Sequence, residues 1–259
     1  MTQKERLLWL IQYLLKENRL SSEVQIPNSN NEQERLLRSL INIRAPKPVT
    51  EEFLQIQDAY FKDKLSNKLL TSIVDLTPIE DNLYLWQGDI TTLKVDAIVN
   101  AANSALLGCF VPCHRCIDNA IHSAAGVQLR WECHEIMQLQ NHEEETGGAK
   151  VTSAYNLPSN YVIHTVGPII TGEVTENDYE QLASCYRSCL EAAKQYQMKS
   201  IAFCCISTGE YHFPNDIAAE IAIHTVREFF KNNDIEMEVV FNVFKEKDYE
   251  LYDRLLSSN

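Results

Sequence analysis

The chain has 259 residues, of which 45% are hydrophobic and 23% charged, a composition that supports a globular core. Its formal net charge of −13 disfavours non-specific binding to nucleic acid or to an anionic membrane surface, so neither is expected as a partner. No apolar run approaches the roughly 18 residues of a membrane span. Residues 1–20 are amphipathic and lack the features of a secretory signal, which predicts a cytoplasmic protein.

The first 75 residues are predicted to form a helical extension. Residues 1–20 carry leucine and isoleucine at helical spacing. Residues 21–35 are polar and are expected to form a loop, and residues 34–45 a short helix. A longer helix is expected over Thr50–Leu70, with Thr50 as its N-cap. The extension contains no motif that predicts chemistry.

Residues 76–259 are predicted to form one α/β domain, because short apolar runs alternate there with helical stretches. The predicted strands are Leu83–Gln87, Ala97–Asn100, Val151–Tyr155, Tyr161–Val166, Ser200–Ile206 and Glu238–Phe244. The predicted helices are Cys116–Gln140, Tyr179–Met198, Asp216–Lys231 and Tyr249–Leu256.

A short segment of this domain holds three thiols and one imidazole. Cys109, His114 and Cys116 can converge on one ion because Pro112 bends the chain between them. Thiolate and imidazole together suit Zn²⁺, and three protein ligands leave a coordination position open for water or substrate. Two alternatives are a closed structural site with Cys113 as the fourth ligand, and buried thiols without metal. Adjacent residues seldom serve one tetrahedral site, so Cys113 is not included in the predicted ligand set.

Three loops follow predicted strands and carry glycine, asparagine, serine or threonine. They span residues 87–91, 100–104 and 207–211. In open α/β sheets, ligands bind where such loops gather at the strand ends. A Ser-Thr-Gly turn can direct successive N–H groups at a phosphate, with Gly209 permitting close backbone approach. The loops together predict a pocket for a phosphate-bearing ligand.

Six segments, in this order, resemble a macrodomain, the ADP-ribose-binding α/β/α fold. They are GDIT at 88–91, VDAIVNAAN at 95–103, IDNAIHSAAG at 117–126, TGGAK at 146–150, YVIHTVGP at 161–168 and ISTG at 206–209. The resemblance covers about residues 83–256 and implies a three-layer α/β/α fold with a mixed central sheet. Residues 109–116 stand where most macrodomains have a glycine-rich loop, so the chain resembles the zinc-dependent microbial branch, whose members carry a helical N-terminal extension.

The resemblance also implies roles for individual residues. Asp89 matches the aspartate that accepts a hydrogen bond from the adenine amino group. Asp118 matches the acidic residue that orients or activates water near the scissile bond, and Asn103 is assigned to the catalytic set with it. Asp118 could instead cap its own helix or form a salt bridge on it. The implied ligand-binding positions are Asp89, Ile90, Asn100, Asn103, Ser207, Thr208, Gly209, Glu210 and Tyr211, of which Ser207–Glu210 match the phosphate loop and Tyr211 the aromatic beside the distal ribose.

The function implied is that of a zinc-dependent hydrolase that removes mono-ADP-ribose from protein side chains. The alternatives are a module that binds ADP-ribose without cleaving it, and a hydrolase of a free small molecule such as an acetylated ADP-ribose. In the microbial systems it resembles, the macrodomain acts opposite a sirtuin-like ADP-ribosyltransferase on a lipoyl-carrier protein, which is therefore the implied substrate. Two departures from the family pattern are the missing glycine-rich loop and His212, which occupies a position commonly held by glycine.

Overall fold

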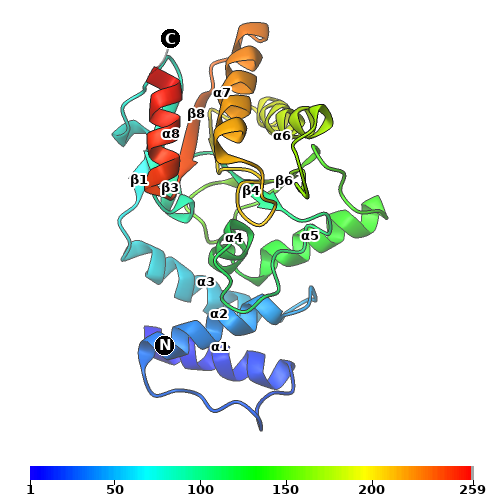
Figure 1. The fold of residues 1–259 in the computed structure, drawn as a ribbon. Coiled ribbons are helices and arrows are strands. Elements are labelled where there is room, and N and C mark those ends of the chain that lie inside the picture. The colour runs from blue at the N-terminus through cyan, green and yellow to red at the C-terminus, as the bar shows by residue number, and fades with distance from the viewer. Residues whose placement is uncertain (258–259) are drawn as a thin grey trace.

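Three helices form the N-terminal extension in the computed structural model, which describes residues 1–257 (Figure 1). They are α1 (Gln3–Glu17), α2 (Asn30–Ile43) and α3 (Glu51–Ser66). Thr50 caps α3 as predicted, its side chain accepting from the N–H of Phe53. The prediction of a loop over residues 21–35 is wrong for its last six residues, because Ser29 caps α2 and the helix begins at Asn30. The apolar faces of the helices meet in a core that includes Leu10, Ile11, Leu14, Leu37 and Phe53.

A six-stranded mixed sheet is the centre of the second part of the chain. Its strands are β2 (Leu83–Gln87), β4 (Ala97–Ala102), β5 (Ala149–Ser153), β6 (Tyr161–Val166), β7 (Ser200–Phe203) and β8 (Glu238–Val243). Their order is β2-β8-β7-β4-β6-β5, and all neighbours are parallel except β5 and β6. The expected mixed sheet is thereby confirmed. Two short strands that were not predicted, β1 (Thr71–Ser72) and β3 (Leu93–Lys94), form a separate parallel pair.

Helices cover the sheet on both sides. They are α4 (Ile117–Ala125), α5 (Val127–Gln140), α6 (Glu176–Gln195), α7 (Asn215–Asn232) and α8 (Glu246–Ser257). Figure 1 shows α4 and α5 between the sheet and the extension, with α6, α7 and α8 on the other side, as expected for three layers. The prediction of one helix over Cys116–Gln140 is wrong, because Gly126 interrupts it with a φ of 97°. No helix within residues 1–257 is long and apolar enough to cross a membrane.

The extension is joined to the α/β domain through a buried arginine. Arg130 of α5 is only 5% exposed, and its Nη1 donates to the carbonyl oxygens of Ile41, Asn42 and Arg44 at 2.9, 2.9 and 2.6 Å. These carbonyls lie at the C-terminal end of α2, where a helix leaves acceptors unsatisfied and favours positive charge. The side chain therefore closes the end of α2 and fixes that helix beside α4 and α5.

Candidate active site

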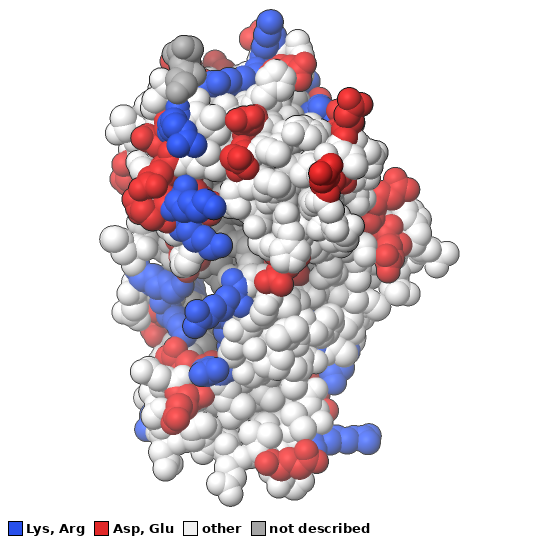
Figure 2. All heavy atoms as spheres, in the orientation of Figure 1, with Lys and Arg blue, Asp and Glu red and all other residues white. Residues whose placement is uncertain are grey.

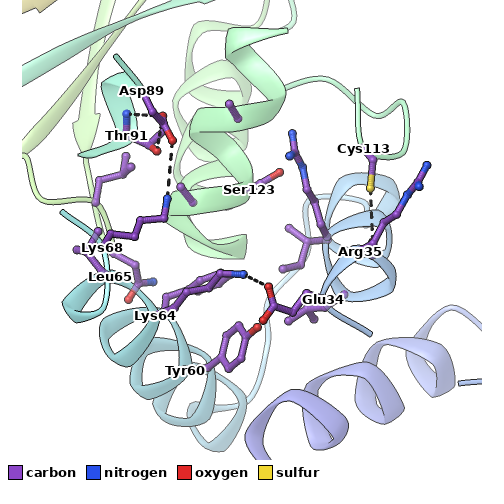
Figure 3. A pocket seen from close by; sticks show the side chains of 18 of the residues that line it. Glu34, Arg35, Tyr60, Lys64, Leu65, Lys68, Asp89, Thr91, Cys113 and Ser123 are labelled. Atoms are coloured by element: carbon purple, nitrogen blue, oxygen red, sulfur yellow. Dashed lines mark hydrogen bonds and ion pairs between the residues drawn. The ribbon is translucent and has the colours of Figure 1, made fainter. Parts of the chain in front are cut away.

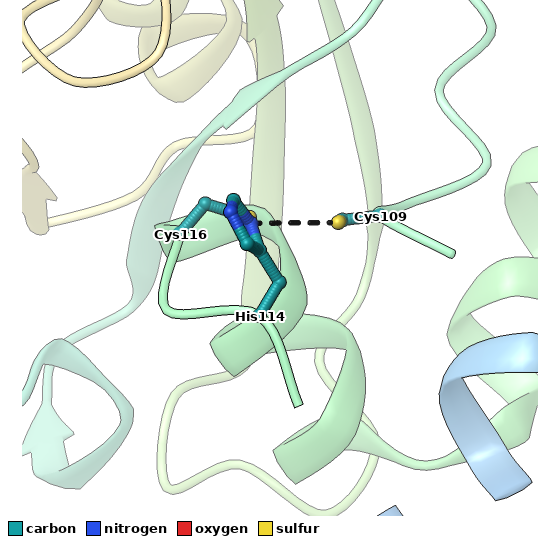
Figure 4. A group of neighbouring side chains, drawn as sticks. All are labelled: Cys109, His114 and Cys116. Carbon is teal, nitrogen blue, oxygen red and sulfur yellow. Dashed lines mark hydrogen bonds between the residues drawn. The ribbon is translucent and has the colours of Figure 1, made fainter. Parts of the chain in front are cut away.

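The three predicted metal ligands converge at the N-terminal end of α4 (Figure 4). The donor atoms of Cys109, His114 and Cys116 all lie within 4.8 Å of one another, and the Cys109 Sγ to His114 Nδ1 distance is 3.7 Å. Bond lengths of about 2.3 Å to sulfur and about 2.0–2.1 Å to nitrogen place these two atoms about 3.6 Å apart around a tetrahedral Zn²⁺. The donor set and its spacing therefore fit a zinc ion.

Cys113 lies outside this cluster. Its Sγ is 3.2 Å from the Ser39 hydroxyl and 3.4 Å from the carbonyl oxygen of Arg35, both on α2. Its backbone N–H donates to Oδ1 of Asn42, also on α2, at 2.8 Å. The alternative of a closed site with Cys113 as the fourth ligand is therefore not supported by the geometry.

Asn119 and Arg38 hydrogen-bond to each other and to the backbone of the loop that carries the three candidate ligands. Asn119 is fully buried, and its Nδ2 donates to the carbonyl oxygens of Cys109 and Val111 at 3.4 and 3.0 Å. Arg38 of α2 donates to Oδ1 of Asn119 from Nε and Nη2, at 3.2 and 2.7 Å, and to the carbonyl oxygen of His114 at 3.0 Å. The extension, for which the sequence predicted no chemistry, thus holds the backbone of the ligand loop.

Cys116 is both a candidate ligand and the N-cap of α4. Its Sγ accepts a hydrogen bond from the N–H of Asn119 at 3.4 Å. Burial raises the pKa of the Cys116 thiol to about 12, while this N–H acts in the opposite direction. A bound divalent cation favours the thiolate, so metal binding at this position is coupled to loss of the thiol proton.

Asp118 lies two residues further along, in the first turn of α4. Its carboxylate accepts from Nδ2 of Asn100 at 2.8 Å and from Nδ2 of Asn103 at 3.3 Å, so it does not cap the helix. His122 approaches it at 3.5 Å, but burial lowers the pKa of His122 well below its usual value, so this imidazole is neutral and forms no salt bridge. Burial raises the pKa of Asp118 to about 6, against the opposing effects of Asn100 and Arg130. A carboxyl group with such a pKa suits a general base near neutral pH.

Asn100 of β4 orients the carboxylate of Asp118 through a hydrogen bond. The side chain of Asn100 has no exposed surface, and its Nδ2 also lies 3.1 Å from Nδ1 of His164. The other ring nitrogen of His164 is 2.9 Å from the hydroxyl of Thr152, which completes the buried network. The resemblance placed Asn100 near the distal ribose. In this structure its Nδ2 contacts Asp118 and His164, while its buried Oδ1 has no hydrogen-bond partner within residues 1–257. The contact orients Asp118, and the placement of Asn100 near the ribose stays a prediction.

The predicted phosphate loop follows β7 and reaches the metal ligands. The hydroxyl of Ser207 is buried against Gly167 and has no hydrogen-bond partner within residues 1–257. A Cβ added to Gly209 would meet no atom within 4 Å, so this backbone is open to a ligand. Oε1 of Glu210 lies 3.6 Å from Nε2 of His114, the ring nitrogen opposite the one that faces Cys109. Glu210 is mostly exposed and this distance is too long for a hydrogen bond, so the contact is a weak electrostatic one.

Tyr211 follows Glu210 at the end of the predicted phosphate loop. Burial raises the pKa of Tyr211, and the carboxylate of Asp118 raises it further. His212 has a φ of 56°, the left-handed region that glycine adopts readily. This backbone conformation explains why glycine is common at the position.

Asp89 and Ile90 form a different part of the predicted site. Ile90 is buried, and Asp89 precedes it at the end of β2. One carboxylate oxygen of Asp89 accepts from the N–H and hydroxyl of Thr91, at 3.0 and 2.7 Å. The other lies 3.7 Å from Nζ of Lys68, a residue that follows α3. The adenine-recognition position thus also contacts the extension.

Sequence reasoning missed the residues that hold the ligand loop: Arg38, Asn42, Asn119 and Arg130. Each lies on a predicted helix, where an arginine or asparagine is usually a surface residue. The available signal was that polar residues interrupt the apolar run of α2, Arg38 directly after Leu37 and Asn42 between Ile41 and Ile43. A polar residue in such a run indicates a buried contact only when the helix that packs against it is known.

Comparison with known proteins shows the family of the chain. A profile of the family described as Macro domain matches residues 99–222. A protein-ADP-ribose hydrolase of Treponema medium is 55% identical, over 99% of this chain and all of its own length.

Solved structures show the same fold. A macrodomain of Trypanosoma brucei, crystallised in complex with ADP-ribose, is 32% identical with a TM-score of 0.67, covering 85% of this chain and 94% of its own. The Oceanobacillus iheyensis macrodomain, with ADP, is 41% identical with a TM-score of 0.63, covering 70% of this chain and 93% of its own. The first of these matches extends over more of the chain than the α/β domain alone.

Proposed function

Because the chain belongs to the macrodomain family, we propose that it is a zinc-dependent hydrolase that removes ADP-ribose from modified protein side chains. The observation that carries the proposal is the placement of Asp118. A buried carboxylate with a raised pKa stands two residues from Cys116, the last of three converging metal-ligand side chains. The Treponema medium relative, matched over its whole length, bears the name protein-ADP-ribose hydrolase.

The residues that would hold the metal are Cys109, His114 and Cys116. A zinc ion bound to them would supply a Lewis acid with one coordination position left for an oxygen of the substrate or of water. Arg38 holds the backbone of His114 from the extension, and the exposed carboxylate of Glu210 lies 3.6 Å from its ring on the phosphate-loop side. The chain therefore presents a preformed donor set whose backbone is held by the extension.

The chemical step assigned to the chain itself is proton transfer at Asp118. Asn100 and Asn103 hold its two carboxylate oxygens, so the group keeps one orientation. A water beside it gives up a proton to the carboxylate as its oxygen bonds to the carbon of the ADP-ribosyl linkage. The bond from that carbon to the protein side chain breaks, and the departing atom takes the proton back from Asp118. The products are the unmodified side chain and ADP-ribose.

Recognition of the nucleotide is assigned to the remaining predicted positions. Asp89 offers a carboxylate oxygen to the adenine amino group, beside the Ile90 backbone. The open backbone at Gly209 suits the diphosphate. Ser207, Thr208 and Glu210 are assigned to the same phosphate loop, and Tyr211 to the distal ribose.

The test is release of ADP-ribose from mono-ADP-ribosylated proteins, with a lipoyl-carrier protein among the substrates. The protein is assayed as purified, after chelation, and after zinc is restored, while calorimetry follows binding of free ADP-ribose. The proposal predicts that chelation abolishes release and that zinc restores it. Binding of ADP-ribose without release from any substrate would establish the non-catalytic alternative. Full release by chelated, metal-free protein would remove the metal from the mechanism.

A further inference from the structure

A large cavity lies where the extension meets the α/β domain. It has a volume of about 630 Å³ and is bounded by α2, α3 and α4. Small side chains of α4, Ala120, Ser123 and Ala124, line the side toward the α/β domain. Figure 3 shows Lys64 and Lys68 reaching into the cavity from the α3 side, opposite Arg35 on α2.

The charge of this cavity is opposite to that of the protein. Five cationic side chains line it: Arg35, Arg38, Lys64, Lys68 and Arg115. Its two lining carboxylates are each paired with one of them, Glu34 with Lys64 and Asp89 with Lys68. In a chain of net charge −13, this is a local reversal of sign. Figure 2 shows Lys and Arg side chains gathered on this face at the level of the junction.

Two of the five cations are free to bind a partner. Arg35 and Arg115 are exposed, and neither side chain has an ion-pair partner within residues 1–257. Arg38, by contrast, is occupied by Asn119 and the His114 carbonyl. Unpaired cations on one wall of a cavity attract a ligand that carries several negative charges.

The cavity also borders the candidate active site. Cys113 and Arg115, which flank the candidate ligand His114, line one part of it, and Asp89 lines another. A protein held by its ADP-ribosylated side chain at the metal ligands would therefore have its neighbouring residues beside this opening.

We propose that this cavity binds an acidic segment of the ADP-ribosylated protein, and so selects substrates by the charge next to the modified residue. The inference rests on the proposed hydrolase function and adds the class of protein that the enzyme prefers. Arg35 and Arg115 provide the attraction, and the small side chains of α4 leave room for the peptide backbone. Attraction between exposed charges acts mainly on the rate of encounter and weakens as salt rises.

The test uses peptides that carry one ADP-ribosylated side chain and differ only in their flanking residues. One series is rich in glutamate, the second has glutamine in its place, and the third has lysine. We expect kcat/KM of the zinc-loaded enzyme to fall from the acidic to the neutral to the basic series, by about tenfold at each step in low salt. The difference should arise in KM and shrink in 0.5 M NaCl.

Charge reversal tests the residues. Arg35→Glu should remove the preference for the acidic peptide while circular dichroism, zinc content and the Kd of free ADP-ribose stay unchanged. Arg115→Glu should act in the same direction, and Arg35→Gln should give an intermediate value. Lys231→Glu, an exposed position in the last turn of α7, is the matched control and should keep the wild-type preference.

A failure of this inference can be distinguished from a failure of the proposed hydrolase function. Hydrolysis of all three peptide series with equal kcat/KM, or a preference that persists in Arg35→Glu and Arg115→Glu, would overturn the assignment of this cavity and leave the hydrolase intact. Hydrolysis of none of the peptides, nor of ADP-ribosylated proteins, would instead contradict the proposed function on which the inference rests.

Discussion

Replacement of Arg38 by methionine tests whether the extension shapes the metal-ligand loop. The substitution keeps most of the aliphatic stem and removes the guanidinium group. That group makes three hydrogen bonds of 2.7–3.2 Å, two to Oδ1 of Asn119 and one to the carbonyl oxygen of His114. Asn119 in turn holds the carbonyls of Cys109 and Val111, so one substitution loosens the backbone at both ends of the loop.

The magnitude follows from the charge on the donor. A hydrogen bond to a charged group contributes about 1.5–3 kcal/mol, and Ser123 still donates to Asn119 after the substitution, so a net loss of about 2 kcal/mol is expected. If that free energy held the ligands in place, it equals about a 30-fold loss of zinc affinity. This lies within the about 10–100-fold range for groups that orient metal ligands.

The assay is a competition between the protein and a chelator of known zinc affinity, with turnover measured on the same samples. Arg38→Met should bind zinc about 30-fold more weakly, and its turnover should recover when zinc is added in excess. Arg6→Met on α1 is the matched control, because within residues 1–257 the Arg6 side chain hydrogen-bonds only to Gln3 of its own helix. Wild-type zinc affinity in a folded Arg38→Met variant would refute the role given to the extension.

Three further substitutions separate binding, metal and chemistry. Cys116→Ala should lower the zinc content from about one ion per chain to a small fraction and abolish turnover, as elemental analysis and a release assay would show; loss of the folded circular dichroism spectrum would indicate a structural metal instead. Asp118→Asn should lower turnover by about 10²–10⁴ while the ADP-ribose Kd stays within about threefold. Unchanged turnover would mean that another group accepts the proton. Asp89→Asn should weaken ADP-ribose by about 10–100-fold in calorimetry, because the amide oxygen can still cap the turn at Thr91 but the charge is lost; unchanged affinity would move adenine recognition elsewhere.

The parts of the fold that could be predicted are those whose signals are local. β2 and β6 have the bounds that their apolar runs predicted, because turn-forming residues flank both runs. The break between α4 and α5 was missed, because a glycine inside a helical pattern does not reveal its φ. Gly126 adopts φ 97° and ψ 179°, a backbone conformation that strains any other residue, and a Cβ there would also lie 2.7 Å from the ends of the Gln57 and Gln128 side chains.

Within the site, too, the features set by local sequence could be predicted and those set by long-range contacts could not. Cys109, His114 and Cys116 lie within eight residues, so their spacing alone predicted that they could converge. The contact between Arg38 and the ligand loop could not be predicted from local spacing, because Arg38 and His114 are 76 residues apart in the chain. Nor could the burial of Asn100, whose side chain faces Asp118 and His164 only because β4 and β6 pair in the observed register.

The ligand loop and the extension are physically linked by the strained backbone of the loop. Cys113 has a φ of 53°, a left-handed conformation that costs a non-glycine residue about 1–2 kcal/mol. A glycine-rich loop adopts such turns without that cost, but it has no side chains to bind a metal. Here α2 compensates, because Asn42 accepts from the N–H of Cys113 and Arg38 donates to the adjacent carbonyl of His114. Arg130 then fixes the end of α2 through three carbonyls, so the loop, the extension and the α/β domain form one active unit.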